Sequence, residues 1–498
     1  MKDIKPWHIL IFLFSVFAAL GGIAYVFPEN GFEIAGQKIS FPTLASYFNT
    51  KKTEKTDISK ILALADAEDQ LTETKPRRDT TKAISKADST AKKEIQYLEV
   101  NDPSIKLITS LQYKDSLKTS LDNFFEALAA SQNDEKGIRI LHYGDSQIEG
   151  DRITDYLRQK LQNNFSGRGP GMIAAMPVAQ SAGIRQSWSD NWDRYTNFAN
   201  VDKRVPHRNF GIAAGFCRFA GFADTVSDKK AWLKIKTYTS AGPSVSTYNK
   251  IKMFYAAPRK KVAIEFFENG MLKKSDSLAT NGNFNIMQFN LSQSPNNFEL
   301  KFEGKDSPDI YGLSLESGGG VMVDNFGLRG SSGTFFNQMN LSHLKLFYDY
   351  LNTKMIILQF GGNALPYLKT KKQCDDFGSF IRSQINSLKK LLPGISILVM
   401  GPSDMSIKEG ETYVTYPLLE DLRNAIRDAA FQTNSAFFDM YDCMGGKNSM
   451  LSWVDQGIAA TDYIHFSPAG ARKIAVLLYS AIMNDYNLFI QKKRKEKS

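Results

Sequence analysis

The sequence predicts an α/β protein in which helices cover both faces of a parallel sheet and an antiparallel β-sandwich interrupts the sheet domain. From residue 137 onward, short apolar segments alternate with amphipathic ones, as strands and helices do when a parallel sheet is buried on both faces. Between residues 182 and 316, apolar and polar residues alternate singly, which is typical of antiparallel strands. An apolar segment and a long polar stretch precede both regions.

The first 28 residues predict a membrane-spanning helix. The stretch from Trp7 to Phe27 contains no Asp, Glu, Lys or Arg, and Lys2 and Lys5 precede it. A helix of this length can cross the hydrocarbon core of a bilayer, which is about 30 Å thick. We therefore expect an uncleaved anchor in the inner membrane, with its lysine-bearing end in the cytoplasm and the rest of the chain in the periplasm. The alternative is a secretory signal cut within FAALGGIA, which would release the chain to the periplasm.

Residues 29–100 predict a polar linker that holds the folded domains away from the membrane. Lys, Thr, Asp, Glu, Ser and Ala dominate its second half, and few large apolar residues interrupt them. Part of the linker, around residues 58–71, is expected to be helical. Residues 116–131 predict a further helix, because apolar residues recur there at helical spacing: Leu117, Leu121, Phe125 and Leu128.

The predicted parallel-sheet domain is discontinuous and comprises residues 101–181 and 317–490. Its expected strands are residues 137–143, 321–328, 355–361, 395–401 and 435–442. A helix is expected after each strand, within residues 153–161, 335–351, 373–392, 416–432 and 467–483. In open sheets of this kind the ligand site lies beyond the carboxyl ends of the strands. Functional residues are therefore expected at those ends.

The predicted sandwich, residues 182–316, lies between the first and second strands of the parallel sheet. Its clearest strands are residues 231–240, 250–257, 261–270, 284–292 and 296–304. Turn sequences such as ENG, TNGN and SPNN separate these strands, which predicts antiparallel pairing between neighbours.

Composition and charge exclude several classes of protein. A hydrophobic content of 42% with 34 Phe is too high for a disordered chain. The net charge is +10, but the clearest basic cluster is the tail at residues 491–498, which is typical of a solvated terminus. Basic and aromatic residues do not combine into a nucleic-acid platform, so no nucleic-acid partner is expected. A basic protein does favour an anionic envelope polymer or membrane surface.

The three cysteines predict neither a metal site nor a disulfide framework. Cys217, Cys374 and Cys443 have no metal-ligand spacing, and their number is odd. One disulfide with a free thiol and three buried thiols both agree with this pattern. No cluster of His, Cys and Asp has ligand spacing either, so we expect no metal and no cofactor.

Ser146 is the candidate nucleophile. It follows Gly144 and Asp145 at the point where the first predicted strand turns into a helix. The amino-terminus of that helix directs backbone N–H groups and the positive end of its dipole to the same place. A serine here can instead simply cap the helix. A nucleophilic role requires a base and a stabiliser for the developing negative charge.

The candidate base is His465, with Asp462 three residues before it. An Asp at this spacing can hydrogen-bond one ring nitrogen, which fixes the tautomer and leaves the other nitrogen free to accept a proton. Ser467 and Pro468 follow as the expected start of the last helix. The chain has five His, and the pair at 462 and 465 is the one with this setting.

Gly330 and Asn363 are candidate donors to an oxyanion, together with the Ser146 N–H. Gly330 follows the second predicted strand and Asn363 follows the third. A turn glycine and a loop amide that bonds its own backbone are the alternatives for these two residues. The order of these residues is a more specific signal than any one of them. A Ser, a Gly and an Asn follow three strands of one predicted sheet, and Asp-x-x-His precedes its last helix.

These motifs resemble those of the SGNH (GDSL-like) hydrolases. The matching segments are Gly144-Asp145-Ser146, Asn325 to Gly330, Gly361-Gly362-Asn363, and Asp462 to His465. The resemblance covers about residues 135–180 and 317–485 and implies a flavodoxin-like sheet with a serine nucleophile, a histidine base and the oxyanion donors named above. Two positions depart from the usual pattern: Gln147 replaces a Leu, and Ala364 follows Asn363 where an Asp is common.

The insertion is similar to the carbohydrate-binding-like module of peptidoglycan O-acetylesterases. The resemblance therefore implies an acetylated envelope glycan, above all peptidoglycan, as substrate and partner. Trp188, Trp192 and Tyr195 lie among polar residues and could stack on sugar rings. The alternative is that they lie in a hydrophobic core or pack between domains. A glycan O-acetyltransferase that uses the same acyl-enzyme and a non-catalytic envelope-binding protein are the alternatives to an esterase.

Overall fold

The computed structural model describes residues 6–28, 31–34, 37–39, 41, 53–73, 110–114, 118–131, 134–181, 183–198, 201–222, 227–410 and 412–496. The chain divides into two compact units. The first contains residues 1–55 and 407–414, and the second contains residues 56–406 and 415–498. The candidate catalytic residues all belong to the second unit.

The first unit contains the apolar helix α1 (Pro6–Val26) and two short hairpins. Helix α1 has 21 residues and a mean hydropathy of 2.5, so it is long and apolar enough to cross a membrane. A signal segment has the same properties, so this helix could be an anchor or a signal. Strands β1 (Phe32–Ile34) and β2 (Gln37–Ile39) pair antiparallel. Strands β18 (Ser406–Glu409) and β19 (Thr412–Thr415) form the second hairpin.

The second unit is built on a five-stranded parallel sheet with the strand order β15-β3-β16-β17-β20. Its strands are β3 (Ile138–Gly144), β15 (Val321–Gly327), β16 (Thr353–Gln359), β17 (Ser396–Met400) and β20 (Ala436–Phe438). Numbered along the chain, this order is 2-1-3-4-5, which is the flavodoxin-like arrangement. The direction of the connections reverses between β3 and β16, so a ligand crevice is expected at the carboxyl ends of these two strands.

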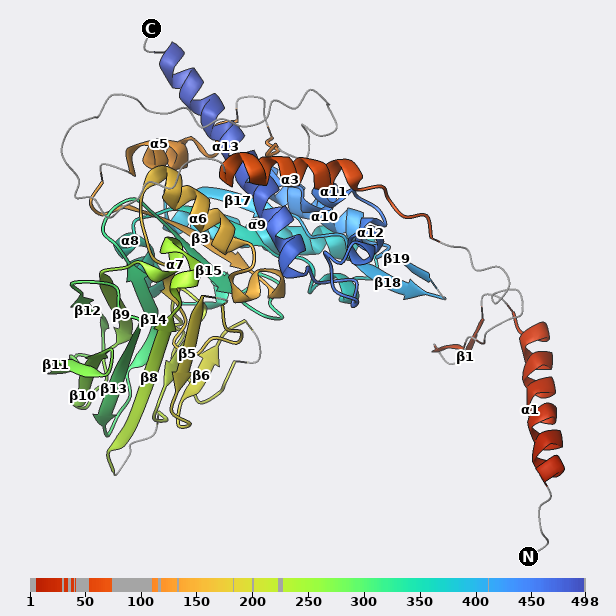
Figure 1. Cartoon of the computed structure of the whole chain (residues 1–498), viewed down its shortest axis with the longest axis horizontal. Coiled ribbons are helices and arrows are strands. Elements are labelled where there is room, and N and C mark those ends of the chain that lie inside the picture. Colours follow the sequence, from red (N-terminus) through yellow and green to blue (C-terminus); the bar gives the residue numbers. More distant parts are fainter. Residues whose placement is uncertain are drawn as a thin grey trace, which may run out of the picture. The chain divides into compact units, whose positions relative to one another are not determined.

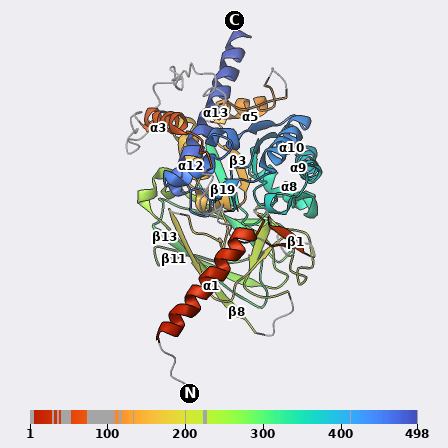
Figure 2. The same cartoon turned by 90° about the vertical axis from the view of Figure 1, so that its right-hand side faces the viewer.

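Helices cover both faces of this sheet, as predicted (Figures 1 and 2). Alternate residues of β3 enter two different cores, with Ile140 in one and Leu141 in the other. The Ile140 face packs against α5 (Asp122–Ala130), α6 (Thr154–Phe165) and α13 (Pro468–Lys495). The Leu141 face packs against α8 (Leu341–Tyr350), α9 (Lys371–Leu391) and α10 (Leu419–Gln432). Short segments complete this domain: α11 (Met440–Met444), α12 (Ser449–Asp455), η4 (Phe336–Gln338) and η5 (Leu365–Tyr367).

The inserted region forms two antiparallel sheets that enclose their own hydrophobic core (Figure 1). One sheet has the order β11-β10-β13-β8-β5, and the other has the order β12-β9-β14-β7-β6, with β4 added beside β14. The strands are β4 (Gly171–Ile173), β5 (Ile184–Trp188), β6 (Asp193–Thr196), β7 (Gly215–Arg218), β8 (Lys229–Thr237), β9 (Lys250–Ala256), β10 (Val262–Glu268), β11 (Met271–Ser277), β12 (Phe284–Asn290), β13 (Asn297–Gly304) and β14 (Asp309–Glu316). Two short helical turns, η3 (Thr239–Ala241) and α7 (Pro243–Ser246), follow β8.

A buried ionic cluster joins the sandwich to the parallel sheet. Arg139 on β3 pairs with Asp324 on β15 at 2.9 Å and also with Glu316 at the end of β14. Asp324 also accepts a hydrogen bond from the Met172 N–H of β4 (2.9 Å). Gly171 has a φ of +76°, and a Cβ on it would collide with the Asp324 carboxylate. This glycine therefore lets β4 lie against the sheet, which fixes where the sandwich begins.

The predicted linker contains a packed helix. Helix α3 (Ser59–Glu73) has buried Leu64 and Ala65 in the same core as α13, and Asp69 pairs with Arg472 of α13 at 2.7 Å. Ile58, Ile61, Leu62 and Ala65 of this segment lie in or against that core and recur at helical spacing, so the segment has a face that it can bury. Residues 74–100 of the linker lie outside the described residues.

Several predicted boundaries shift. Helix α5 begins at Asp122 rather than Ser116, and residues 115–117 lie outside the described residues. Helix α13 continues to Lys495, so most of the expected basic tail is helical. All three cysteines are buried free thiols, in agreement with one of the two patterns left open by the sequence: Cys217, Cys374 and Cys443.

Candidate active site

Ser146 lies at the carboxyl end of β3, where the strand turns into the 3₁₀ helix η2 (Ser146–Asp151). The cap of this helix is Asp145, whose side chain accepts a hydrogen bond from the Gln147 N–H at 3.0 Å. A Cβ at Gly144 would lie 2.9 Å from the Ile148 side chain, so glycine permits the sharp turn. Because Asp145 supplies the cap, the Ser146 hydroxyl is free for another role.

Ser146, His465 and Asp462 form a continuous hydrogen-bonded line. Ser146 Oγ lies 2.8 Å from His465 Nε2, and His465 Nδ1 lies 2.8 Å from Asp462 Oδ2. The other carboxylate oxygen of Asp462 accepts the N–H groups of Ile464 and His465 at 2.9 and 3.0 Å. The line brings together residues 319 positions apart in the chain.

The surroundings of Asp462 keep it ionised at neutral pH. Partial burial raises its pKa, but the hydrogen bonds from the backbone and ring of His465 outweigh that effect and hold the pKa below its ordinary value. An ionised Asp462 accepts a hydrogen bond from the Nδ1–H group of His465. Nε2 is then left as an acceptor for the Ser146 hydroxyl proton.

Gly330 and Asn363 lie on the loops that follow the two strands beside β3. Gly330 comes after β15 with a φ of +80° and open space where a Cβ would be. The Leu328 N–H, two residues earlier, donates to the Gly144 carbonyl at 2.8 Å and ties this loop to the start of η2. Asn363 follows β16, and its Nδ2 donates to Ser331 O at 3.1 Å and to Asp145 Oδ2 at 3.3 Å. An oxyanion at Asn363 would compete with the longer of these two bonds.

Residues 276–478 match the model of a family described as GDSL-like Lipase/Acylhydrolase. The chain carries a GDSL-like acylhydrolase domain. The matched range includes Gly330, Asn363, Asp462 and His465, whereas Ser146 lies before it. The domain is an esterase/acylhydrolase of the SGNH type, and its fold is the one that the sequence motifs predict. A comparison with curated proteins finds no match.

One solved structure extends the likeness beyond the matched range. A structure titled "Peptidoglycan O-acetylesterase in action, 5 min" is 20% identical and covers 76% of this chain and 99% of that chain, with a TM-score of 0.59. This share is larger than the parallel-sheet domain alone, so the common fold includes the sandwich. The acetyl xylan esterase AlAXEase is 18% identical and covers 32% of this chain and 81% of that chain, with a TM-score of 0.24. The carbohydrate acetylesterase Est24 from Sinorhizobium meliloti is 15% identical and covers 33% of this chain and 77% of that chain, with a TM-score of 0.23.

In this acylhydrolase domain, Gln147 holds the backbone around His465. Its Nε2 donates to Ile464 O at 2.7 Å, and its Oε1 accepts the Phe466 N–H at 3.3 Å. Arg152 adds a third bond from the same segment, to Phe466 O at 3.3 Å. Gln147 stands where a Leu is usual, and no sequence pattern indicates its hydrogen-bond partners. The amide fits this site because a leucine could make neither bond.

The aromatic residues expected to stack on sugars lie mainly in hydrophobic cores. Trp192 is 6% exposed and packs edge-on against Phe219 and Phe302, and Tyr195 is 2% exposed. The expectation of a stacking surface is therefore wrong for these two residues, because their rings are covered by the sandwich and by the contact between the two domains. Trp188 is partly buried against the sandwich core.

Asp145 is a buried carboxylate in contact with the candidate oxyanion donor. Burial raises its pKa to about 6, although the Gln147 N–H and the nearby His465 act in the opposite direction. The folded-state pKa thus lies above the ordinary value of 3.8. Ionised Asp145 therefore opposes folding at pH values above about 6, and this unfavourable contribution disappears as the pH falls toward 4.

We expect Asp145→Asn to raise the free energy of unfolding, relative to the parent protein, by more at pH 8 than at pH 4. A shift from 3.8 to about 6 corresponds to about 2–3 kcal/mol between these pH values, because the variant has no charge to bury. The measurement is urea unfolding of both proteins at pH 4 and pH 8. Asp228→Asn, at an exposed position of the sandwich, serves as the control. A change in unfolding free energy that is the same at both pH values would show that Asp145 is not a high-pKa group.

Proposed function

We propose that this chain is a serine carbohydrate esterase that removes O-acetyl groups from a cell-envelope glycan, above all peptidoglycan. The observation that carries the proposal is the line of hydrogen bonds from Ser146 Oγ through His465 to Asp462, with 2.8 Å at each step. A hydroxyl becomes a nucleophile when a base accepts its proton and a third group orients that base. This arrangement supplies both.

The reaction proceeds through an acetyl-serine intermediate. His465 Nε2 accepts the Ser146 proton while Oγ attacks the acetyl carbonyl carbon, and the N–H groups of Ser146 and Gly330 and the Asn363 amide stabilise the resulting oxyanion. His465 then donates the proton to the sugar oxygen, which leaves as a hydroxyl. A water molecule attacks the acetyl-serine with His465 again as base, which releases acetate and restores Ser146.

Three features support a polymeric envelope substrate. His465 is 33% exposed and Asp462 is 47% exposed, so the reacting groups lie at an open surface that a polysaccharide can reach. The likeness to the solved peptidoglycan O-acetylesterase includes the sandwich as well as the catalytic domain. The apolar helix α1 would hold the domain at the inner membrane, facing the periplasm, where the envelope polymer lies.

Acetate release from two acetylated polymers tests the proposal. With the full-length chain in detergent micelles, we expect kcat/KM on O-acetylated peptidoglycan to exceed that on acetylated xylan at least about tenfold, and Ser146→Ala to lower the release at least about 10³-fold. Equal rates on the two polymers would contradict the peptidoglycan assignment. Transfer of acetyl to an added glycan acceptor at the expense of acetate would show that the chain is an O-acetyltransferase.

A further inference from the structure

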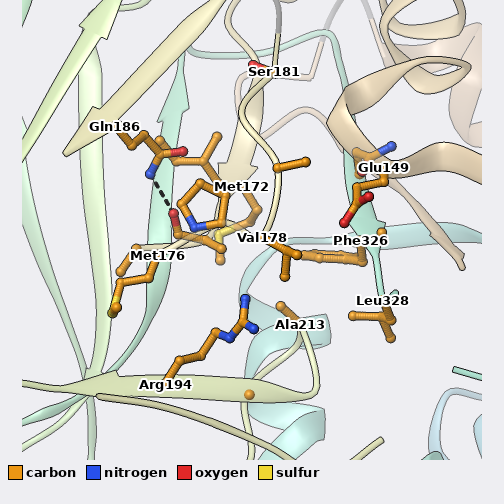
Figure 3. Close-up of a pocket in the computed structure, with 18 of the residues that line it drawn as sticks. Glu149, Met172, Met176, Val178, Ser181, Gln186, Arg194, Ala213, Phe326 and Leu328 are labelled. Atoms are coloured by element: carbon orange, nitrogen blue, oxygen red, sulfur yellow. Dashed lines mark hydrogen bonds between the residues drawn. The ribbon is translucent and has the colours of Figure 1, made fainter. Parts of the chain in front are cut away.

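A cavity of about 150 Å³ lies between the catalytic domain and the sandwich (Figure 3). Its walls come from the end of η2, from the end of β15 and the loop after it, and from the segment between β4 and β5. Most of the lining is apolar, including Met172, Met176, Val178, Phe326 and Leu328. This cavity does not include Ser146 or His465, so it is separate from the hydrogen-bonded line described above.

Glu149 presents an unsatisfied acceptor on the catalytic side of this cavity. Its side chain is 6% exposed, and its Oε2 accepts hydrogen bonds from the Arg329 guanidinium. The other oxygen, Oε1, is buried and has no hydrogen-bond partner among the described residues. A buried carboxylate oxygen without a hydrogen-bond partner destabilises the fold, so a ligand with an N–H or O–H donor would recover that cost.

Arg194 extends from β6 into the cavity on the opposite side from Glu149 (Figure 3). Within the described part of the chain, its guanidinium makes no ion pair and no side-chain hydrogen bond. Its N–H groups are therefore available to a carbonyl or carboxylate oxygen. The cavity thus combines an acceptor without a hydrogen-bond partner among the described residues, an available donor and an apolar wall.

The cavity lies beside the reacting serine. Glu149 is three residues after Ser146 in η2, so their Cα atoms are at most about 11 Å apart. On the neighbouring loop, Leu328 lines the cavity and lies two residues before Gly330. A glycan whose ester lies at Ser146 can therefore also place a neighbouring group in the cavity.

We propose that this cavity binds the acetamido group of an N-acetylated amino sugar in the glycan substrate. The amide N–H would donate to Glu149 Oε1, the amide oxygen would accept from Arg194, and the methyl group would contact the apolar wall. A sugar hydroxyl in the same position brings no methyl group, and a free ammonium brings a positive charge toward Arg194. This inference rests on the proposed function and names the feature by which the site selects its glycan.

Direct binding separates this inference from the esterase activity. The probes are tetra-N-acetylchitotetraose and cellotetraose, which share the β-1,4 backbone and differ in carrying an acetamido group or a hydroxyl. By titration calorimetry on the full-length Ser146→Ala protein, we expect the acetylated probe to bind at least about tenfold more tightly, as a charge-assisted hydrogen bond would give. Equal affinities would overturn the inference even if acetate release from peptidoglycan is observed.

Two variants assign the preference to the cavity. Arg194→Gln removes the charged donor, and Ala213→Phe fills the space from the sandwich side. Both are expected to reduce the preference for the acetylated probe to within about twofold, whereas Arg185→Gln, an exposed arginine on β5 outside the cavity, should keep it. A preference that survives both variants would place acetamido recognition elsewhere. Absence of esterase activity with an intact preference would instead contradict the proposed function.

Discussion

Ser146→Ala is expected to lower kcat/KM for 4-nitrophenyl acetate by at least about 10³-fold, because no other group can form the acyl-enzyme at this position. The oxyanion donors and the substrate contacts remain, so a small residual rate above the uncatalysed one is expected. Asp145 rather than Ser146 caps η2, and the thermal unfolding midpoint should therefore hardly change. The measurement is initial-rate kinetics on the purified full-length variant.

A matched serine shows that the effect is local. Ser292→Ala, at an exposed position after β12, should keep the activity of the parent protein. A serine-directed phosphonate should label the parent protein at Ser146 in a one-to-one ratio and leave Ser146→Ala unlabelled. Activity above a tenth of the parent value in Ser146→Ala would contradict the mechanism. Lack of labelling in the parent protein would favour a non-catalytic envelope-binding role.

His465→Ala is expected to cause a loss of similar size, about 10³-fold or more, because the Ser146 proton then has no acceptor. His465 is 33% exposed, so the space left by its ring is open to solvent. Added imidazole should therefore restore part of the activity at pH 7.5. A purely structural role for His465 would give a loss that imidazole does not change.

His207 offers the control for this second prediction. It lies in the sandwich segment and is 26% exposed. Its Nε2 contacts Asp309 Oδ2 at 2.9 Å, so it is a histidine paired with an aspartate, as His465 is, but without the candidate nucleophile. His207→Ala should leave esterase kinetics unchanged and insensitive to imidazole. An equal loss in both histidine variants would show that general destabilisation, rather than a missing base, explains the result.

The sequence by itself determined the secondary structure and the chemical types at the strand ends. Strands such as 137–143 are apolar runs of fixed length followed by amphipathic helices, and this periodicity depends only on neighbouring residues. Once the strands are located, the sequence also shows that a Ser, a Gly and an Asn follow successive strands and that Asp-x-x-His precedes the last helix. A parallel sheet brings its carboxyl ends to one edge, so residues far apart in sequence were expected to meet there.

Only the tertiary structure decided which side chains touch. Gln147 bonds the backbone on both sides of His465, Trp192 and Tyr195 are buried, and α3 packs on α13 although it lies in a polar stretch. The cavity with the unpartnered oxygen of Glu149 arises where the sandwich and the catalytic domain meet. Local sequence patterns do not predict such contacts, because burial and hydrogen-bond partners depend on surfaces that come together only when the whole chain folds.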